Sequence, residues 1–432
     1  MEELLGIIGI MIVITETYRM LRRIWIRRML AKRKNGKRTR KPQVMRPKSE
    51  KDCPFCVAEK GKKAEKKAED PQAWSQRKGN GGRRKTQSTQ GWFCPNDACE
   101  YYRIEEETIH ALVRNGRHGK PEAIQDLKCQ ACGKKFSVRR NTVLYRLKTD
   151  SRVVEKILWL VALGVDSSAL EEVFAVREST IRSWLCRSGQ QGRKLHERMM
   201  VELELIHIQL DELWADVKHS QQEMWLWVAS DAQTKLIPVL QVGGRTQEMA
   251  YGVVHELKSR LKMGCIPVFS TDGLKNYYYA LTAHFGKWKW VGKKKPVWEL
   301  LSDFVYGQVV KHQRKRVTVE VERRMLAGEE KAYRERLKAA GQSGRINTAY
   351  VERLNLTIRQ CVSKLTRRTW GPAQYTPELV EQLEWWRSYY HFARYHESLE
   401  VRLEKPVKRK GKQQPRRIRR RTPATPALQR TQ

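Results

Sequence analysis

Three carboxylates in this chain have the residue types and flanking sequences of a divalent-metal site. Asp211 lies in LIHIQLDELW and Asp272 in PVFSTDG, each at the end of an apolar run, and Glu352 lies in NTAYVERLNLTIRQ. Carboxylate oxygens are hard ligands that suit Mg²⁺ or Mn²⁺, and such ions activate water and stabilise a leaving oxygen. The trio therefore predicts a catalytic metal site with Asp211, Asp272 and Glu352 as its ligands.

Paired cysteines predict a second, structural metal site. WFCPNDACEYY holds Cys94 and Cys99, and LKCQACGKKFS holds Cys129 and Cys132. Zinc takes four ligands in a tetrahedron, commonly two from each of two tight turns. The spacing predicts that these four thiolates bind Zn²⁺; the alternative is that they are core cysteines without a metal.

A third pair, Cys53 and Cys56 in CPFC, is a weaker zinc candidate because no second pair lies within its own segment. It could pair with a downstream set, bind metal weakly or have no role. Short cysteine spacings in a chain without secretory character favour metal binding in a reducing compartment over disulfides.

The carboxylates must be positioned by a block of mixed strands and helices over residues 201–400. HIQLDELW alternates apolar and polar residues, which predicts a strand ending near Asp211. Two strands, a helix, the short strand CIPVFSTDG and a second helix follow. Asp231 falls in the turn between two of these strands and is interpreted as structural. Glu212 is set aside because it points to the face opposite Asp211.

The third carboxylate is predicted to lie on a helix. An apolar stripe through VERLNLTIRQCVSKL leaves Glu352, Asn355 and Arg359 on one face, at offsets of three and seven. A carboxylate, an amide and a guanidinium on one exposed face suit metal and phosphate binding. A solvated face held by ion pairs is the alternative.

Residues 149–200 read as three helices separated by turns, the arrangement of a helix-turn-helix whose last helix enters the DNA major groove. Ile181, Trp184 and Leu185 face inward. A plain helical bundle is the alternative. The predicted DNA-binding residues on the outer face are Arg177, Ser179, Thr180, Arg182, Ser183 and Arg187.

The charge of the chain favours a polyanionic partner, with nucleic acid ahead of a membrane surface. Lys and Arg number 86 against 47 acidic residues, giving a net charge of +39. The apolar stretch Leu4–Ile14 is too short to span a bilayer, which takes about 20 residues. Residues 1–90, with this stretch, are predicted to be mainly basic linker, and 401–432 a disordered basic tail. The predicted location is the cytoplasm, in association with the nucleoid.

QLDELW, STDG and AYVERLNLTIRQ resemble the three signature segments of DDE transposases, most closely those encoded by insertion sequence 1 and its relatives. The resemblance covers roughly residues 91–397, and Glu352 to Arg359 is its most specific part. WWRSYYHFARYHESL is also similar to the aromatic end of integrase-type cores. The stretch between Asp272 and Glu352 is longer than expected for compact members, which predicts a basic, tryptophan-bearing insertion and a further strand at about 286–345.

The resemblance implies an α/β fold: a ribonuclease-H-like mixed sheet over 201–400, preceded by a zinc ribbon at 91–148 and the helix-turn-helix. In such a core the first and fourth strands lie side by side, which would join Asp211 and Asp272. It further implies two Mg²⁺ or Mn²⁺ ions per site, Arg359 as a phosphate clamp, and cleavage and strand transfer at transposon ends by a homo-oligomer. A non-catalytic DNA-binding regulator and a nuclease of the same fold are the alternatives.

Overall fold

The computed structural model describes residues 72–78, 88–120, 122–290, 296–314, 317–366, 371–402 and 419–422. The stretch Leu4–Ile14 and the pair Cys53 and Cys56 lie outside the described residues. None of the described helices combines the length and the apolar composition needed to cross a bilayer.

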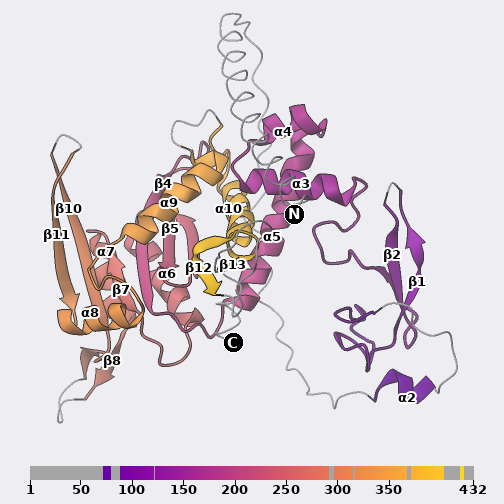
Figure 1. Ribbon diagram of the computed structural model, residues 1–432, viewed down its shortest axis with the longest axis horizontal. Helices are drawn as coiled ribbons and strands as arrows, with labels where there is room; N and C mark the ends of the chain where they lie inside the picture. The colour runs from indigo at the N-terminus through magenta and orange to yellow at the C-terminus, as the bar shows by residue number, and fades with distance from the viewer. Residues whose placement is uncertain are drawn as a thin grey trace, which may run out of the picture. The chain divides into compact units, whose positions relative to one another are not determined.

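A mixed sheet of six strands, in the order β11-β10-β7-β4-β5-β6, forms the centre of the second half of the chain (Figure 1). β7 lies between β4 and β10 and runs parallel to both, while the remaining neighbours are antiparallel. The first and fourth strands of this block, β4 and β7, are therefore adjacent, as predicted. The strands are β4 (His207–Ala215), β5 (Met224–Asp231), β6 (Val239–Gly243), β7 (Val268–Thr271), β10 (Val305–Arg314) and β11 (Val317–Ala327).

Helices cover both faces of this sheet. Successive side chains of β4 point to opposite faces, and the apolar ones on each face pack against a different pair of helices. Ile208 and Leu210 pack with α6 (Gln247–Arg260) and α7 (Lys275–His284). Leu213 and Ala215 pack on the opposite face, with α9 (Ala349–Cys361) and α10 (Thr376–Phe392). On that second face, α8 (Glu330–Ala339) also packs against β7 and β10. The predicted mixed α/β architecture is confirmed.

The insertion expected at about 286–345 is narrower in the structure. β10, β11 and α8 belong to the central sheet and its cover. Only β8 (Gly286–Lys289) and β9 (Val297–Leu300) form a sheet of their own. One further strand was predicted in this stretch; the structure has two, β10 and β11, which pair antiparallel at one edge of the central sheet.

The helical block consists of α3 (Ser151–Ala162), α4 (Ser167–Phe174) and α5 (Glu178–Met199). The predicted inward residues Ile181, Trp184 and Leu185 are buried in one core with α3. α5 is longer than the predicted helix and continues along α10. A Cβ atom at Gly189 would lie 2.2 Å from the carbonyl oxygen of Glu381, so only glycine permits this approach. The predicted domain boundary at residue 200 therefore lies between α5 and α10, two helices that pack closely on each other.

The cysteine block folds as a three-stranded antiparallel sheet of β1 (Leu112–His118), β2 (Ile124–Cys129) and β3 (Lys135–Ser137). It also takes in α2 (Trp74–Lys78), from the region predicted to be linker. Trp74 packs edge-to-face on Tyr101, with ring centroids 5.7 Å apart, and its indole donates to Gln130 Oε1 at 2.9 Å. One aromatic residue thus ties this part of the basic segment to the block.

The tail expected to be disordered from residue 401 contains a described strand. β13 (Arg419–Thr422) pairs antiparallel with β12 (His396–Arg402). Basic composition alone did not indicate this pairing.

Candidate active site and zinc site

Asp211 and Asp272 meet because they occupy equivalent positions on neighbouring parallel strands. Leu210 of β4 pairs with Thr271 of β7, and each Asp is the next residue along its chain. Oxygen atoms from Asp211, Asp272 and Glu212 all lie within 4.8 Å of one another. The prediction that the two aspartates lie close together is confirmed, and the carboxylate of Glu212 lies beside them.

The pKa values of the three carboxyl groups are raised above their ordinary values. Burial is the main cause, and the neighbouring charges of Asp272 and Glu212 add to it, so that the pKa of Asp211 rises to about 7. Burial also raises the pKa of Asp272 and that of Glu212. Like charges in a site of low polarity favour the protonated form. A bound cation would remove this cost by favouring the ionised carboxylates.

Glu212 was set aside on the sequence because it points to the opposite face from Asp211, and the structure corrects that exclusion. Its carboxylate does lie on the α7 side, where Arg245 forms an ion pair with it and the Tyr277 hydroxyl donates to it at 3.3 Å. It nevertheless reaches the group, since one of its oxygens lies within 4.8 Å of oxygens of both Asp211 and Asp272. Its position directly after Asp211 was the available signal.

α9 is fixed against β4 by Gln209, whose role sequence reasoning missed. Gln209 is fully buried, accepts a hydrogen bond from the Val351 amide at 2.9 Å and donates to the Asn347 carbonyl at 2.9 Å. The available signal in the sequence was a polar residue two positions before Asp211, on the same face of the predicted strand. This clamp places the first turn of α9 beside Asp211.

Asn355 has a different environment from the one predicted. It was expected on an exposed face as a DNA-binding residue, but it is 7% exposed and its Nδ2 donates to Asp211 Oδ2 at 2.8 Å. Among the described residues its Oδ1 accepts no hydrogen bond. Asn355 therefore orients the Asp211 carboxylate, and its free oxygen suits a cation or a water molecule bound to one.

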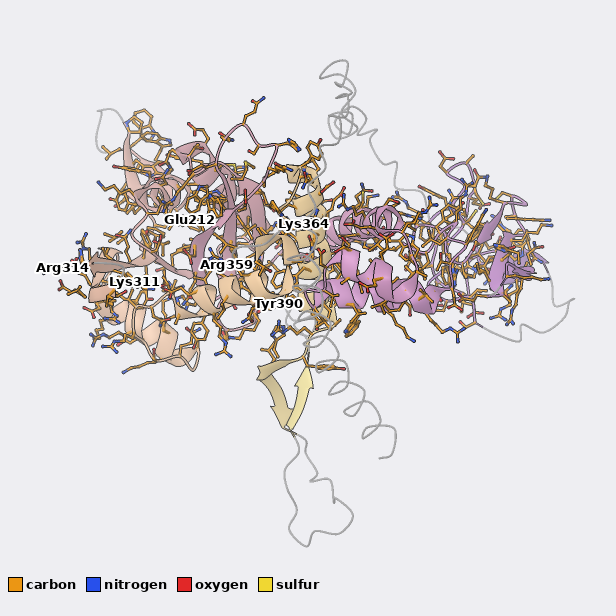
Figure 2. All side chains as sticks on the ribbon, turned by 90° about the horizontal axis from the view of Figure 1, so that it is seen from above. Glu212, Lys311, Arg314, Arg359, Lys364 and Tyr390 are labelled. Atoms are coloured by element: carbon orange, nitrogen blue, oxygen red, sulfur yellow. The ribbon has the colours of Figure 1, made fainter. Side chains whose placement is uncertain are left out.

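Glu352 lies outside the carboxylate group but close enough to raise the pKa of both aspartates. Its Oε1 forms an ion pair with Lys311 of β10 at 2.5 Å and accepts from the Thr348 hydroxyl at 2.5 Å. Figure 2 labels Lys311 together with Arg359, the predicted phosphate clamp on α9. Two aspartates are thus brought together, while the third predicted ligand pairs with a lysine.

Asp231, interpreted on the sequence as a turn residue, has that role. Its carboxylate accepts from the Thr234 amide at 2.7 Å and from the His207 amide at 3.1 Å. These bonds hold the turn after β5 against the start of β4.

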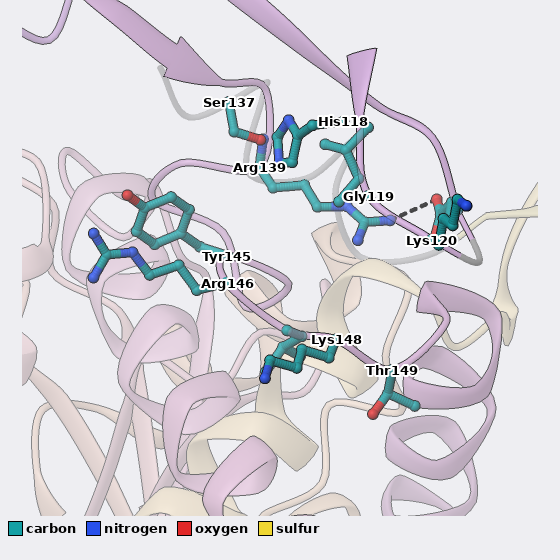
Figure 3. A pocket seen from close by; sticks show the side chains of 12 residues that line it. His118, Gly119, Lys120, Ser137, Arg139, Tyr145, Arg146, Lys148 and Thr149 are labelled. Atoms are coloured by element: carbon teal, nitrogen blue, oxygen red, sulfur yellow. Dashed lines mark hydrogen bonds and ion pairs between the residues drawn. The ribbon is translucent and has the colours of Figure 1, made fainter.

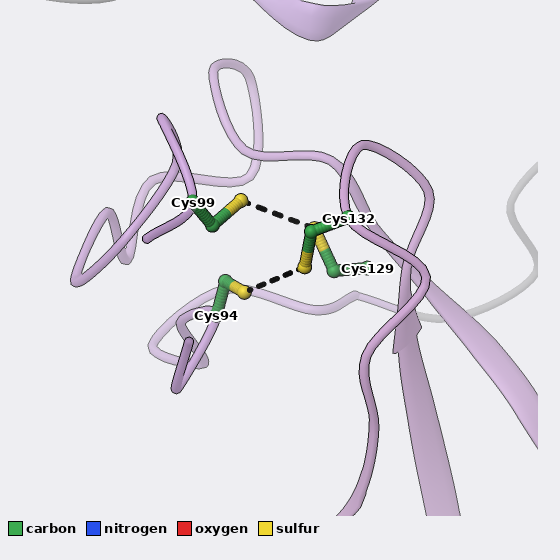
Figure 4. Close-up of side chains that lie close together, drawn as sticks. All are labelled: Cys94, Cys99, Cys129 and Cys132. Atoms are coloured by element: carbon green, nitrogen blue, oxygen red, sulfur yellow. Dashed lines mark hydrogen bonds between the residues drawn. The ribbon is translucent and has the colours of Figure 1, made fainter. Parts of the chain in front are cut away.

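The four predicted zinc ligands converge at one point (Figure 4). The Sγ atoms of Cys94 and Cys132 are 3.6 Å apart, and those of Cys99 and Cys129 are 3.8 Å apart. A tetrahedron with Zn–S bonds of about 2.3 Å has edges of about 3.8 Å. The donor set and its spacing fit Zn²⁺, and burial raises the pKa of Cys99 to about 11, a cost that a zinc ion would reverse.

The predicted DNA-binding residues of the helical block differ in their exposure and in their contacts with neighbouring residues. Arg177, Ser179, Arg182 and Ser183 are exposed, although Arg182 pairs with Glu178 at 2.8 Å. Thr180 is half-buried. Arg187, also half-buried, donates to the Tyr145 carbonyl at 2.6 Å and so holds the segment before α3.

A basic pocket of about 250 Å³ lies between the cysteine block and this segment (Figure 3). Its charges come mainly from Lys120, Arg139, Arg146 and Lys148. Arg139 pairs with Glu122 at 2.5 Å, and the same carboxylate accepts from the Ser151 amide of α3 at 3.1 Å. Glu122 thus connects the cysteine block to the helical block.

No protein-family model matches the chain, and no curated protein matches it significantly.

Proposed function

We propose that this protein is a DDE-type DNA transposase that cuts DNA at transposon ends and joins them to a target. The observation that carries the proposal is the meeting of Asp211 and Asp272 at the ends of two parallel neighbouring strands, with Asn355 of α9 bonded to Asp211. The order β6-β5-β4-β7-β10 also agrees with a ribonuclease-H-like core. The net charge of +39 supports a polyanionic substrate.

In this proposal Asp211, Asp272 and Glu352 hold two Mg²⁺ or Mn²⁺ ions. Bound there, the ions would activate the attacking water or 3′ hydroxyl and stabilise the leaving oxygen of the phosphodiester. The chain's own residues prepare the site. Asn355 holds the Asp211 carboxylate, and Gln209 holds the α9 backbone beside β4.

In this proposal the positive side chains around the carboxylates attract the DNA backbone. Lys311 on β10 forms an ion pair with Glu352, and Arg245 forms one with Glu212. Arg359 would hold a phosphate from α9. The cysteine block, as a zinc ribbon, and the exposed start of α5 would bind the transposon ends.

The direct test replaces Asp272 by Asn, which keeps the shape of the side chain and removes a metal-binding charge. We expect strand transfer with a transposon-end duplex to fall below detection while the gel-shift affinity for that duplex stays the same. Full strand transfer by this variant would refute the assignment. Cleavage without joining by the wild-type protein would instead assign a nuclease of the same fold.

A further inference from the structure

The β8–β9 hairpin carries three tryptophans close together. Trp288 and Trp298 lie directly opposite each other in the antiparallel pair, so their rings share one face. Trp290 follows Trp288 by two positions, just beyond the end of β8. Within the described residues, β8 and β9 pair with each other and with no strand of the central sheet.

The ring of Trp298 is fixed by its neighbours and supports that of Trp288. The Trp298 indole donates to the Thr282 carbonyl of α7 at 2.9 Å, and a Cβ atom on Gly286 would lie 2.5 Å from its ring. Trp288 meets it edge-to-face, with centroids 5.3 Å apart. Trp288 and Trp290 are nevertheless 66% and 70% exposed. Open indoles on an anchored hairpin are typical of an interaction site rather than of a core.

The charge beside these rings indicates which partner they fit. Lys287 and Lys289 are exposed on β8, where strand alternation places them on the face opposite Trp288, and Lys289 pairs with Glu299 at 3.0 Å. In the sequence three further lysines, Lys293, Lys294 and Lys295, follow. Exposed aromatic rings beside cations bind single-stranded nucleic acid, because bases stack on the rings while the cations contact phosphates. Two copies meeting at this hairpin would bring their exposed Lys287 side chains together, and like charges across an interface are unfavourable.

We infer that Trp288 and Trp290 form a stacking platform for unpaired bases of a DNA strand. This platform is separate from the carboxylates, because the hairpin follows the far end of α7, a ten-residue helix about 15 Å long whose first turn follows Asp272. The inference rests on the proposed function, since strand exchange at a transposon end exposes unpaired bases. A closed duplex hides its base faces and would not use the platform.

The test compares the binding of a fluorescein-labelled single-stranded oligo(dT) with that of a duplex of equal length, by anisotropy. The double variant Trp288→Ala/Trp290→Ala should raise the Kd for oligo(dT) by about tenfold or more. The Kd for the duplex should stay the same, and Trp288→Phe/Trp290→Phe should retain most of the oligo(dT) affinity. The single variant Trp290→Ala, in a residue outside the strand, guards against loss of folding, and the melting temperature checks each protein.

Unchanged oligo(dT) affinity in folded alanine variants would overturn the inference. A lower oligomeric state by light scattering, with oligo(dT) affinity unchanged, would assign the tryptophans to contact between copies and would also overturn it. Wild-type protein that binds neither DNA would refute the proposed function together with the platform. Normal duplex binding and strand transfer without an effect of the alanine variants on oligo(dT) would refute the platform alone.

Discussion

In the cysteine cluster the four ligands come from two short segments, whereas in the carboxylate group they come from β4 and from the residue after β7. Cys94 and Cys99 lie in one tight segment, and Cys129 and Cys132 lie in a second. Asp211 and Asp272 are joined only by the pairing of two strands that are separated in sequence by two further strands and a helix. The first site is largely local and the second depends on the whole sheet.

The two sites also differ in how complete they are. All four sulfur atoms lie within 4.8 Å of one another, and two of their distances, 3.6 Å and 3.8 Å, match the edge of a zinc tetrahedron. Among the carboxylates, Glu212 lies inside the group with Arg245 as its partner, while Glu352 is paired with Lys311. Tight turns can fix ligands before any metal binds, but mutually repelling carboxylates come together fully only when a cation offsets their charge.

The largest effect is expected at the cysteine cluster. Cys129→Ser should abolish zinc binding and unfold the β1–β3 sheet, because structural zinc supplies about 10–16 kcal/mol in small zinc-binding peptides. Hydrogen exchange should rise across residues 94–137 and remain slow in β4 and β7. Metal analysis should show one zinc ion fewer per chain, and specific end binding should weaken.

Cys265→Ser is the matched control, since Cys265 lies outside the cluster and contacts the Leu205 carbonyl, which a serine hydroxyl can also reach. It should keep its zinc. Slow exchange across 94–137 in Cys129→Ser would show that the sheet does not depend on a metal.

The second prediction separates the two carboxylates that could complete the catalytic group. Glu352→Gln should lower the strand-transfer rate by more than about 100-fold, beyond the 10–100-fold typical of residues behind the ligands. Glu212→Gln should remain within that smaller range, since Arg245 and Tyr277 already engage its carboxylate. The reverse order would make Glu212 the ligand and Glu352 a surface residue paired with Lys311.

The third prediction concerns pH. The pKa of Asp211 is raised from 3.8 to about 7 in the folded protein, so its contribution to stability is present at acidic pH and is lost as pH rises through about 7. Mn²⁺ at one hundred times its Kd should raise the melting temperature by about 5–10 °C at pH 8. The shift should be much smaller at pH 5.5, where protons compete for the same oxygens.

Asp211→Asn/Asp272→Asn is the control for this experiment, and its melting temperature should not respond to Mn²⁺ at either pH. Equal shifts at both pH values in the wild-type protein would contradict a site made of carboxylates with raised pKa values.

The smallest effect is expected at the clamp between β4 and α9. Gln209→Ala leaves the buried Val351 amide without its acceptor, which should lower the free energy of unfolding by about 1–3 kcal/mol. Gln241→Ala, which removes a half-buried amide bonded to Glu256 on the other side of the sheet, should cost less. Equal losses of stability in urea titrations would show that Gln209 has no special part in placing α9.

Some parts of the carboxylate site could be predicted from local sequence patterns and others could not. Alternation in HIQLDELW predicted the strand that carries Asp211, because a strand has a fixed period of two. The resemblance to a ribonuclease-H-like core predicted that this strand lies beside the one that ends at Asp272. Helical periodicity placed Glu352, Asn355 and Arg359 on one face but could not tell which part of it is buried. The contact of Asn355 with Asp211 depends on how α9 packs on β4, and no local pattern encodes that packing.

The sequence by itself determined the residue types of both candidate metal sites, the cysteine turns, the run of strands and helices from β4 to α7, and a charge suited to a polyanion. These are properties of short segments, fixed by turn geometry, backbone periodicity and composition. Only the tertiary structure decided that Glu212 joins the aspartates, that Asn355 is buried, that Glu352 pairs with Lys311 and that two tryptophans of the hairpin lie open to solvent. The physical reason is that each of these depends on contacts between elements far apart in the chain, where burial and charge are set by the neighbours that folding supplies.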